Sequence, residues 1–416
     1  MKNPFHRPGQ SPEIWKVLSS RRMLVCLVMG FASGLPLLLT ITLLQAWMKE
    51  AGVDLGTIGL MSLVGLPYTL KFLWAPLLDR YVPPLLGRRR GWLLIFQLTL
   101  TGSICLLAAS DPAGSPWAVA AAALTLTFFS ASQDIVIDAY RREDLPDEEL
   151  GLGSSLYIAG YRVGMWVCSA GGLILADHFP FPTVYLIMAA CLLPAMITTV
   201  LTPEPPAPAG RPLSLKEAVI EPFADYFARS GAVLILAFIL LYKIGDSMAS
   251  AMTIPFYLDL HFTKTEIGTI VKTIGLWATI AGGLAGGAMM LRLGINRSLW
   301  VFGFLQMIST AGFAVLAGVG HSLAGLTAVV GFENLTSGMG TAAYAAFMAS
   351  LTNKKFTATQ YALLSSLMGV PRVIVSSSTG YMAEFLGWQG FFIFCTLIAL
   401  PGLVLLSRFA PLRKSG

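Results

Sequence analysis

The stretch FFSASQDIVIDAYRRE, residues Phe128 to Glu143, decides the fold class of this protein. It closes a long apolar run, and two arginines follow. An apolar run that ends in arginines is typical of a helix that crosses a membrane and stops at its cytoplasmic face. The stretch also places Asp134 and Asp138 on one face of that helix, because they are four residues apart. Two carboxylates inside a membrane span indicate a functional role there.

The composition of the whole chain supports a membrane protein. Of its 416 residues, 55% are hydrophobic and only 12% are charged, and the mean hydropathy is +0.71. An ordinary soluble protein has about 25% charged residues. The five cysteines lie inside apolar runs and the four histidines are scattered, so we expect no metal site, no disulfide framework and no cofactor.

Long apolar runs recur along the chain, and a spanning helix needs about 20 such residues. We therefore predict an all-α polytopic membrane protein with twelve transmembrane helices. The first apolar run has no small-residue signal-peptide cleavage site near it. We therefore expect this run to remain in the protein as a helix. The predicted spans are 23–47, 57–78, 92–110, 116–140, 151–176, 183–202, 232–258, 265–291, 298–319, 322–351, 358–383 and 388–408.

The basic residues predict the orientation of these spans. With both termini in the cytoplasm, 21 of the 28 Lys and Arg residues fall on the inner side. Only Lys49 and Lys264 fall outside, and five lie within spans. This asymmetry follows the positive-inside rule. The net charge of +6 is therefore explained by topology, and we expect the lipid bilayer rather than nucleic acid as a partner.

The two halves of the chain align at a nearly constant offset, which predicts an internal repeat. Gln97 corresponds to Gln306 at an offset of 209, and Arg162 corresponds to Arg372 at 210. We predict two six-helix bundles related by a pseudo-two-fold axis, at residues 1–202 and 232–416. Residues 203–231 form a cytoplasmic linker with a short interfacial helix. Such a repeat allows alternating access, and no GxxxxGK[ST] motif for ATP occurs.

Apart from Glu266 and Arg408 at the very ends of two spans, nine charged residues fall within the predicted spans. Each is a functional candidate because its insertion costs at least about 2.5–3.5 kcal/mol. Five are basic and four are acidic, so the interior carries a positive surplus that suits an anionic cargo. Arg162, Lys243 and Glu333 lie near the midplane, while Lys71 and Asp134 share a depth and could pair. The set is Lys71, Arg162, Lys243, Lys272, Arg372, Asp134, Asp138, Asp246 and Glu333.

Several candidates have a structural alternative. Lys243 and Asp246 are three residues apart and either bind cargo or neutralise each other. Glu333 with Asn334, and Gln133 beside Asp134, either bind cargo or form hydrogen bonds between helices. Asp138 fits a gate better than a ligand. The GGLAGG run, residues Gly282–Gly287, is typical of close helix packing rather than of phosphate binding.

Eight motifs between the first and the eleventh span form a recognisable set. They are GFASGLPLLLT (Gly30–Thr40), LQAWM (Leu44–Met48), KFLWAPLLDRY (Lys71–Tyr81), GRRRGW (Gly87–Trp92), SASQDIV (Ser130–Val136), LYKIGD (Leu241–Asp246), FENL (Phe332–Leu335) and GMGT (Gly338–Thr341). Together they resemble the AmpG-type muropeptide permeases of the major facilitator superfamily. The resemblance implies proton-coupled uptake of anhydro-muropeptides across a bacterial inner membrane, for cell-wall recycling, with an effect on β-lactamase induction.

The loop between the second and third spans departs from the usual pattern of that superfamily. An Asp and a basic cluster normally lie close together there, whereas YVPPLLG separates Asp79-Arg80 from the three arginines at 88–90. We expect Asp79 and Arg80, with Asp138, to belong to the cytoplasmic gate. The three arginines are explained as well by the positive-inside rule as by the gate.

These observations lead to one leading hypothesis and three alternatives. The leading hypothesis is a monomeric, proton-coupled importer. Cargo contacts come from Lys71, Gln133, Asp134, Arg162, Lys243, Asp246, Lys272, Glu333 and Asn334. Proton binding uses Asp134 or Glu333, whose burial disfavours the charged form. The alternatives are a carrier of a nucleotide or acyl-CoA, a membrane-embedded acyltransferase, and a sensor without transport. No triad or metal spacing favours the enzyme.

Overall fold

The computed structural model describes residues 20–53, 57, 61–206, 215–229, 231–370 and 379–409. Within these ranges all regular secondary structure is helical. The elements are α2 (Arg21–Leu38), η1 (Leu39–Leu43), α3 (Leu44–Glu50), η2 (Met61–Gly65), α5 (Leu66–Leu70), η3 (Lys71–Leu73), α6 (Ala75–Arg80), α7 (Arg88–Ala108), α8 (Pro116–Asp144), α9 (Leu150–Trp166), η4 (Val167–Gly171), α10 (Gly172–Ala176), α11 (Phe181–Ala190), α12 (Leu193–Leu201), α13 (Leu215–Phe227), α14 (Ala232–Leu241), α15 (Ile244–Asp259), α16 (Lys264–Ile267), η5 (Gly268–Ile274), α17 (Gly275–Val319), α18 (Leu323–Leu351), η6 (Lys354–Phe356), α19 (Thr357–Val370), α20 (Thr379–Leu397) and α21 (Leu400–Phe409).

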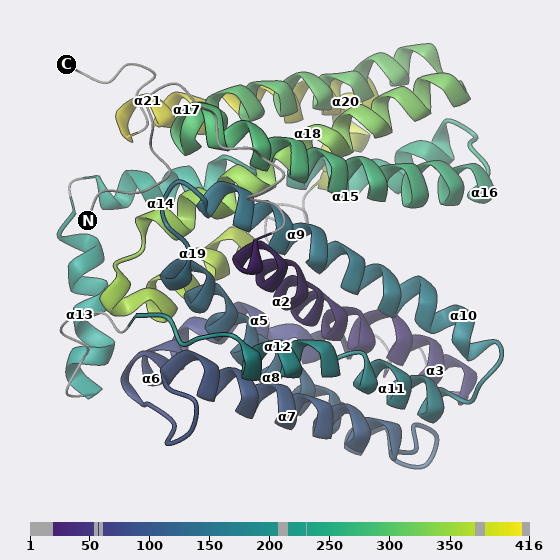
Figure 1. Ribbon diagram of the computed structural model, residues 1–416. Coiled ribbons are helices and arrows are strands. Elements are labelled where there is room, and N and C mark those ends of the chain that lie inside the picture. The colour runs from purple at the N-terminus through teal and green to yellow at the C-terminus, as the bar shows by residue number, and fades with distance from the viewer. Residues whose placement is uncertain are drawn as a thin grey trace.

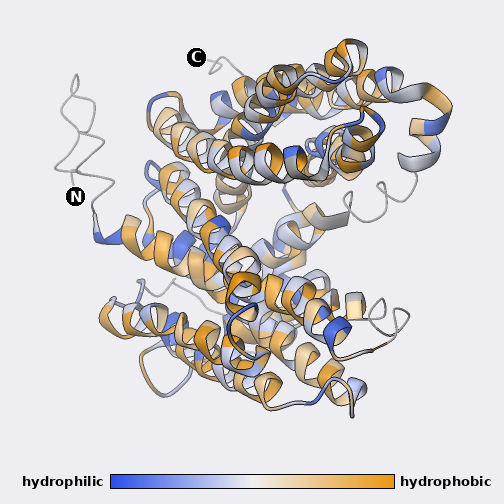
Figure 2. Cartoon of the chain, turned by 90° about the vertical axis from the view of Figure 1, so that its right-hand side faces the viewer, coloured by the Kyte–Doolittle hydropathy of each residue, from blue (hydrophilic) through white to orange (hydrophobic). Residues whose placement is uncertain are grey.

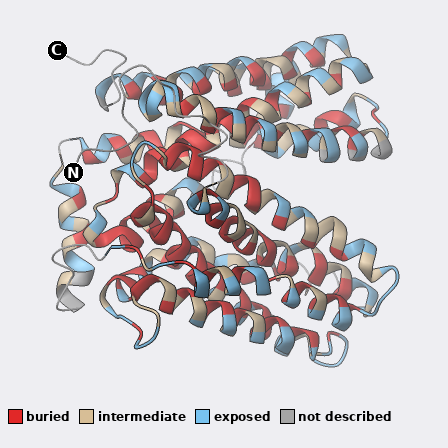
Figure 3. Ribbon diagram, viewed as in Figure 1, coloured by how far each residue is buried: buried red, intermediate tan, exposed pale blue. Residues whose placement is uncertain are grey.

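The helices form two bundles that follow one another along the chain (Figure 1). Elements α2 to α12 build the first bundle and α14 to α21 the second. The bundles meet at the end that holds α6, α13 and the start of α19, which we call the closed side. They spread apart towards α3, α10 and α16, which we call the open side. Buried residues concentrate inside the first bundle and along the junction on the closed side (Figure 3).

The surface of both bundles is apolar, as a bilayer environment requires. Apolar residues dominate the helices in Figure 2. Large hydrophobic side chains are exposed on them, among them Trp117, Leu201 and Phe385. In the described ranges, eight helices are long and apolar enough to cross a membrane. The predicted spans 265–291 and 298–319 lie in one continuous ribbon that bends at Gly294, where φ is 75°.

The second predicted span, 57–78, differs from the expected continuous helix. Its described part, from residue 61, consists of the short pieces η2, α5, η3 and α6. Gly65 precedes the break into α5, and Pro67 and Pro76 stand at the starts of α5 and α6. Proline supplies no N–H and clashes with the preceding turn, so it begins helices and does not continue them. The apolar composition is as expected, but the helix is segmented.

Glycines allow the closest helix contacts in each bundle. A Cβ at Gly30 of α2 would lie 2.0 Å from the Tyr157 carbonyl oxygen of α9. A Cβ at Gly282 of α17 would lie 1.9 Å from the Leu335 carbonyl oxygen of α18. Backbone atoms cannot move aside as a flexible side chain does, so these positions need glycine. The GGLAGG run therefore packs helices, as its spacing predicts.

Helix α13 docks on the closed side against the segment that joins α18 to α19. Asp225 accepts hydrogen bonds from Asn353, Gln360 and Arg229 at 3.1, 2.8 and 2.6 Å. Lys355 donates to Glu221 of α13 at 2.8 Å. The SLKE cap expected at its start includes Ser214, which lies outside the described residues. The linker helix is thus tied to the second bundle by charged and amide groups.

Candidate functional site

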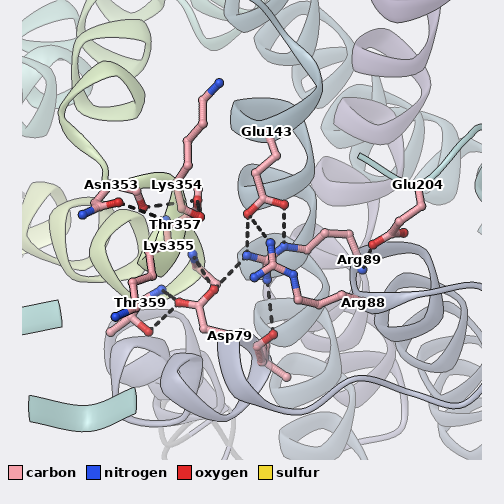
Figure 4. A network of polar contacts seen from close by, with 12 residues as sticks. Asp79, Arg88, Arg89, Glu143, Glu204, Asn353, Lys354, Lys355, Thr357 and Thr359 are labelled. Atoms are coloured by element: carbon pink, nitrogen blue, oxygen red, sulfur yellow. Dashed lines mark hydrogen bonds and ion pairs between the residues drawn. The ribbon is translucent and has the colours of Figure 1, made fainter. Parts of the chain in front are cut away.

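On the closed side, Asp79 links the two bundles. It lies in the last turn of α6 in the first bundle and is fully buried. Its carboxylate accepts from the backbone N–H groups of Ala358 and Thr359 at 3.2 and 2.9 Å, and from the Thr359 hydroxyl at 2.8 Å (Figure 4). These groups belong to the first turn of α19. A carboxylate there satisfies free N–H donors and meets the positive end of the helix dipole.

Arginines from the start of α7 complete this cluster. Arg89 is fully buried and donates to Asp79 at 2.7 Å and to both Glu143 oxygens at 2.7 and 3.1 Å. Arg88 donates to the same Glu143 carboxylate at 2.9 Å. Glu204 accepts from the backbone N–H groups of Arg89 and Arg90 at 2.7 and 3.0 Å, and so caps α7. Figure 4 shows Glu143 and Asp79 on either side of the Arg89 guanidinium.

Of the two neighbouring residues predicted for the gate, the structure places Asp79 in the cluster and Arg80 outside it. Asp79 lies at the centre of the cluster, whereas the Arg80 guanidinium lies over the Tyr81 ring, 5.0 Å from its centroid. Arg89, the second of the three arginines that follow YVPPLLG, takes the position beside Asp79. The loop between α6 and α7 folds back, so the sequence separation of Asp and Arg does not separate them in space.

Asp138 belongs to a second contact between the bundles, centred on Arg141. The Arg141 guanidinium donates to Asp138 at 3.1 Å and to the Tyr361 hydroxyl of α19 at 2.9 Å. It also lies 4.4 Å from the centroid of the Tyr157 ring. Arg141 is buried rather than simply marking the membrane surface. We call Asp138, Arg141, Tyr157 and Tyr361 the latch.

Inside the first bundle, Asp134 is buried near the latch. It accepts a short hydrogen bond from the Ser33 hydroxyl, and Ser33 in turn lies 2.9 Å from the Tyr157 hydroxyl. The positive charge of Lys71 acts on both Asp134 and Asp138. No Lys71–Asp134 ion pair within 4.0 Å occurs in the described part, so the expected direct pair is replaced by a longer-range interaction.

Gln133 and Asn334 are occupied by contacts between helices. Gln133 of α8 donates to the Ala32 carbonyl of α2 at 3.0 Å, and its own carbonyl oxygen has no partner among the described residues. Asn334 of α18 accepts from the Thr279 hydroxyl of α17 at 3.0 Å and donates to the Val330 carbonyl at 2.9 Å. Both amides therefore make the hydrogen bonds between helices that the structural alternative predicts, and cargo binding by them stays a prediction.

Inside the second bundle, Lys243 stands at the break between α14 and α15. Its ammonium group lies 3.2 Å from Asp246 and 3.1 Å from the Gln306 side-chain oxygen of α17. Glu333 of α18 accepts a short hydrogen bond from Ser309, whose hydroxyl lies 2.8 Å from that of Thr336. The Asp246 and Glu333 carboxyl groups lie close enough to act on each other. Lys243 and Asp246 therefore neutralise each other, and they also share one buried site with Glu333.

Three of the predicted site residues do not belong to the groups of contacts given above. Arg162 of α9 is half-buried and has interacting neighbours. Lys272 belongs to η5, but its side chain lies outside the described part. Arg372 lies outside the described residues altogether. The described site therefore consists of the closed-side cluster, the latch and one buried charged group in each bundle.

Several residues of these groups were not predicted. They are uncharged polar or aromatic residues inside spans, arginines explained by topology, and Glu143, an acid just beyond the end of a span. Ser33 lies within the GFASGLPLLLT motif, and Gln306 corresponds to Gln97 in the repeat, so both had a weak signal. Tyr361 had none. The missed residues are Ser33, Arg88, Arg89, Arg141, Glu143, Tyr157, Gln306, Ser309 and Tyr361.

Two helical bundles that meet around buried charges are also found in known proteins. The family model described as Major Facilitator Superfamily matches residues 23–376 and 245–416. The chain belongs to this superfamily. It is also 46% identical over 95% of its length to an anhydromuropeptide permease of Escherichia coli (strain K12), and covers 81% of that protein. It is 34% identical over 94% of its length to a putative transporter AmpG 4 of Rickettsia felis, covering 97% of that protein. It is therefore a member of the AmpG group of this superfamily.

Solved structures show the same fold at low sequence identity. The Escherichia coli fucose:proton symporter matches 98% of this chain and 100% of its own with a TM-score of 0.73 and 12% identity. The proton:xylose symporter XylE matches 94% and 95% with a TM-score of 0.71 and 9% identity. Together with the family, this fold establishes a multi-pass membrane transporter, not an enzyme.

Proposed function

We propose that this transporter imports N-acetylglucosaminyl-1,6-anhydro-N-acetylmuramyl peptides from the periplasm to the cytoplasm. The observation that carries the proposal is the 46% identity over 95% of the chain to an anhydromuropeptide permease. Identity that extends through both bundles includes the cargo pathway between them, and so supports the same class of cargo. The transporter acts as a monomer in the inner membrane of a bacterium, where it serves peptidoglycan recycling and influences β-lactamase induction.

The proposed topology has twelve spans and places both termini in the cytoplasm. The basis is the distribution of Lys and Arg, of which 21 lie on the side of the termini. The closed side holds Arg88, Arg89 and Arg141, so in this topology it is the cytoplasmic side. The conformation described here then faces the periplasm, with Asp79 and Asp138 in the closed cytoplasmic gate.

The proposed energy source is the proton gradient, and no further cofactor is needed. Cargo carboxylates meet Lys71, Arg162 and Lys243, and a proton binds at Asp134 or Glu333. Both acids are buried, which favours their neutral form and gives them a reason to take up a proton. Two bundles around buried charges suit alternating access, in which the site is exposed to one side at a time.

The test is uptake of labelled anhydro-muropeptide into membrane vesicles with an imposed pH gradient. We expect the labelled muropeptide to accumulate only while the pH gradient is maintained. Excess unlabelled muropeptide should abolish this accumulation, and excess acyl-CoA should not. Lys71→Met should raise the KM for the cargo, while Lys49→Met, which removes an exposed lysine on the open side, should leave it unchanged. Competition by acyl-CoA alone would replace the proposed cargo, and gradient-independent accumulation would refute proton coupling.

A further inference from the structure

The second bundle holds two carboxyl groups beside one ammonium group. Asp246 lies in the first turn of α15, and Glu333 reaches it from α18. The two carboxyl groups lie close enough to act on each other, and Lys243 lies 3.2 Å from Asp246. An ionised carboxylate can only accept hydrogen bonds. Two neighbouring carboxyl groups can therefore form a hydrogen bond with each other only when one of them carries a proton.

The surroundings of this group support a single shared proton. Ser309 donates to Glu333, and Gln306 accepts from Lys243 at 3.1 Å. The other titratable side chains described as acting on the two acids are the phenols of Tyr242 and Tyr257, which are neutral near pH 7. Lys243 is thus the described cation that acts on both acids. The positive charge of Lys243 balances one ionised carboxylate. The other carboxyl group has no such counter-charge, which favours its protonated, neutral form.

The first bundle provides the contrast. There, Lys71 acts on Asp134 and Asp138, and Arg141 forms an ion pair with Asp138. Two cations face two acids, so both acids can be ionised without leaving an unbalanced negative charge. The balance of charges therefore favours the second bundle as the place where a proton is held.

We propose that Asp246 and Glu333 share one proton, with Lys243 as their fixed counter-ion, and that these three residues form the proton-binding site of the carrier. The proposal rests on the proton coupling in the proposed function. A proton from water forms an O–H bond with a carboxylate oxygen, and it leaves to water when that bond breaks. A small cavity adjoins the group, and Tyr242, Asp246, Gln306 and Thr310 line it together with apolar residues such as Met307 and Leu403.

Loss of the proton changes the contacts of Lys243. Two carboxylates in contact repel each other, and one ammonium group must then serve both. Lys243 is drawn towards Glu333 and away from Gln306, which alters the contact between the α14–α15 break and α17. Gly340 leaves room for this arrangement, because a Cβ there would lie 2.7 Å from the Gln306 oxygen. Protonation is thereby linked to the packing of three helices.

Infrared difference spectroscopy of the purified full-length protein tests the shared proton directly. We expect a C=O stretching band of a protonated carboxylic acid at neutral pH that disappears in Glu333→Gln and in Asp246→Asn. Asp134→Asn should leave that band in place. Asp259→Asn removes an exposed carboxylate from the same helix as Asp246 and serves as the control. A band that persists in both Glu333→Gln and Asp246→Asn, or that disappears only in Asp134→Asn, overturns the proposal.

Transport measurements separate this inference from the proposed function. Glu333→Gln should lose accumulation driven by a pH gradient but keep exchange of labelled for unlabelled muropeptide without a gradient. Retained accumulation in both Glu333→Gln and Asp246→Asn refutes the pair as the coupling site. Wild-type protein that shows the band yet does not transport muropeptide would refute the proposed cargo, while the shared proton of Asp246 and Glu333 would stand.

Discussion

At the scale of single residues, Asp79 shows how one carboxylate can hold two bundles together. It accepts four hydrogen bonds, from Arg89 in its own bundle and from Ala358 and Thr359 in the other. The three hydrogen bonds from Ala358 and Thr359 are lost if α19 moves away, whereas Arg89 stays beside Asp79. Because Asp79 and Arg89 are fully buried, their interaction is screened little by water. The closed side therefore depends on this residue more than on the exposed charges around it.

Asp79→Asn should favour opening of the closed side. The amide keeps the size of the side chain, but its NH2 group replaces an oxygen that accepts hydrogen bonds from α19. A buried N–H or O–H donor of α19 that is left without an acceptor costs about 1–3 kcal/mol, which weakens the contact between the bundles. A cysteine at Ala362, which is buried in α19, reports opening in a background without the natural cysteines. We expect faster reaction of Ala362→Cys with a polar maleimide in the Asp79→Asn variant.

The control for this measurement is Asp111→Asn, which changes an exposed loop residue on the open side. It should leave the reaction rate at Ala362→Cys unchanged. Equal rates in the Asp79→Asn variant and the parent protein would contradict a gating role for Asp79.

At the scale of helices, irregular backbone coincides with the lysines inside the membrane. Lys71 begins the short helix η3, Lys243 stands at the break between α14 and α15, and Lys272 lies in the π-helical turn η5. Backbone without regular hydrogen bonds is tolerated at membrane depth only where protein buries it or where it lines a cavity. Transporters use such broken helices to build binding sites. The prolines explain the segmented second span, and its break places Lys71 at the start of η3.

Helix α13 is the element whose docking should depend on pH. Partial burial of Asp225 favours its neutral form, but hydrogen bonds from Gln360, Arg229 and Asn353 outweigh that effect and lower its pKa below the ordinary 3.8. A lowered pKa in the docked state means that the carboxylate stabilises docking above pH 3.8. This contribution is lost as the pH falls through the lowered pKa.

We therefore expect the mobility of a spin label at Ile220, an exposed residue of α13, to increase as the pH falls below 3.8. Asp225→Asn should raise the mobility at neutral pH and remove this part of the pH dependence. A label whose mobility responds equally to pH in both proteins would show that Asp225 does not hold α13.

At the scale of the whole molecule, direct contact between the bundles determines which side is closed. The latch joins α8 to α19 through Arg141 and Tyr361. Next to it, Gly287 of α17 packs against α9, and a Cβ there would lie 2.3 Å from the Ser155 hydroxyl oxygen and 3.3 Å from the Leu152 Cα. The closed state thus needs a glycine where two helices of different bundles meet.

Gly287→Val should keep the bundles apart on the closed side. An overpacked interface costs about 1–3 kcal/mol, and here the bundles can avoid that cost by separating. Spin labels at Leu85 and Lys354, exposed residues of the two bundles on that side, should report a longer distance.

Gly318→Val, on the same helix, should not change that distance, because a Cβ at Gly318 meets nothing within 4 Å. An unchanged distance in Gly287→Val would mean that the bundles close without the contact between α17 and α9.

The sequence by itself determined that this is a helical membrane transporter of the AmpG group. Hydropathy along each run and the cost of inserting a charge act locally, so composition reveals spans and marks residues such as Asp134, Lys243 and Glu333. The motifs from GFASGLPLLLT to GMGT carried the family, because they extend through both halves of the chain.

Only the tertiary structure decided which of these residues are partners. Arg89 rather than Arg80 meets Asp79, Ser33 donates to Asp134, and the Asp246 carboxyl group meets that of Glu333. It also decided which side is closed, through contacts such as that between Arg141 and Tyr361. The physical reason is distance along the chain. Hydrogen bonds and ion pairs act over a few ångströms between segments that are up to 280 residues apart, and no local pattern encodes which segments meet.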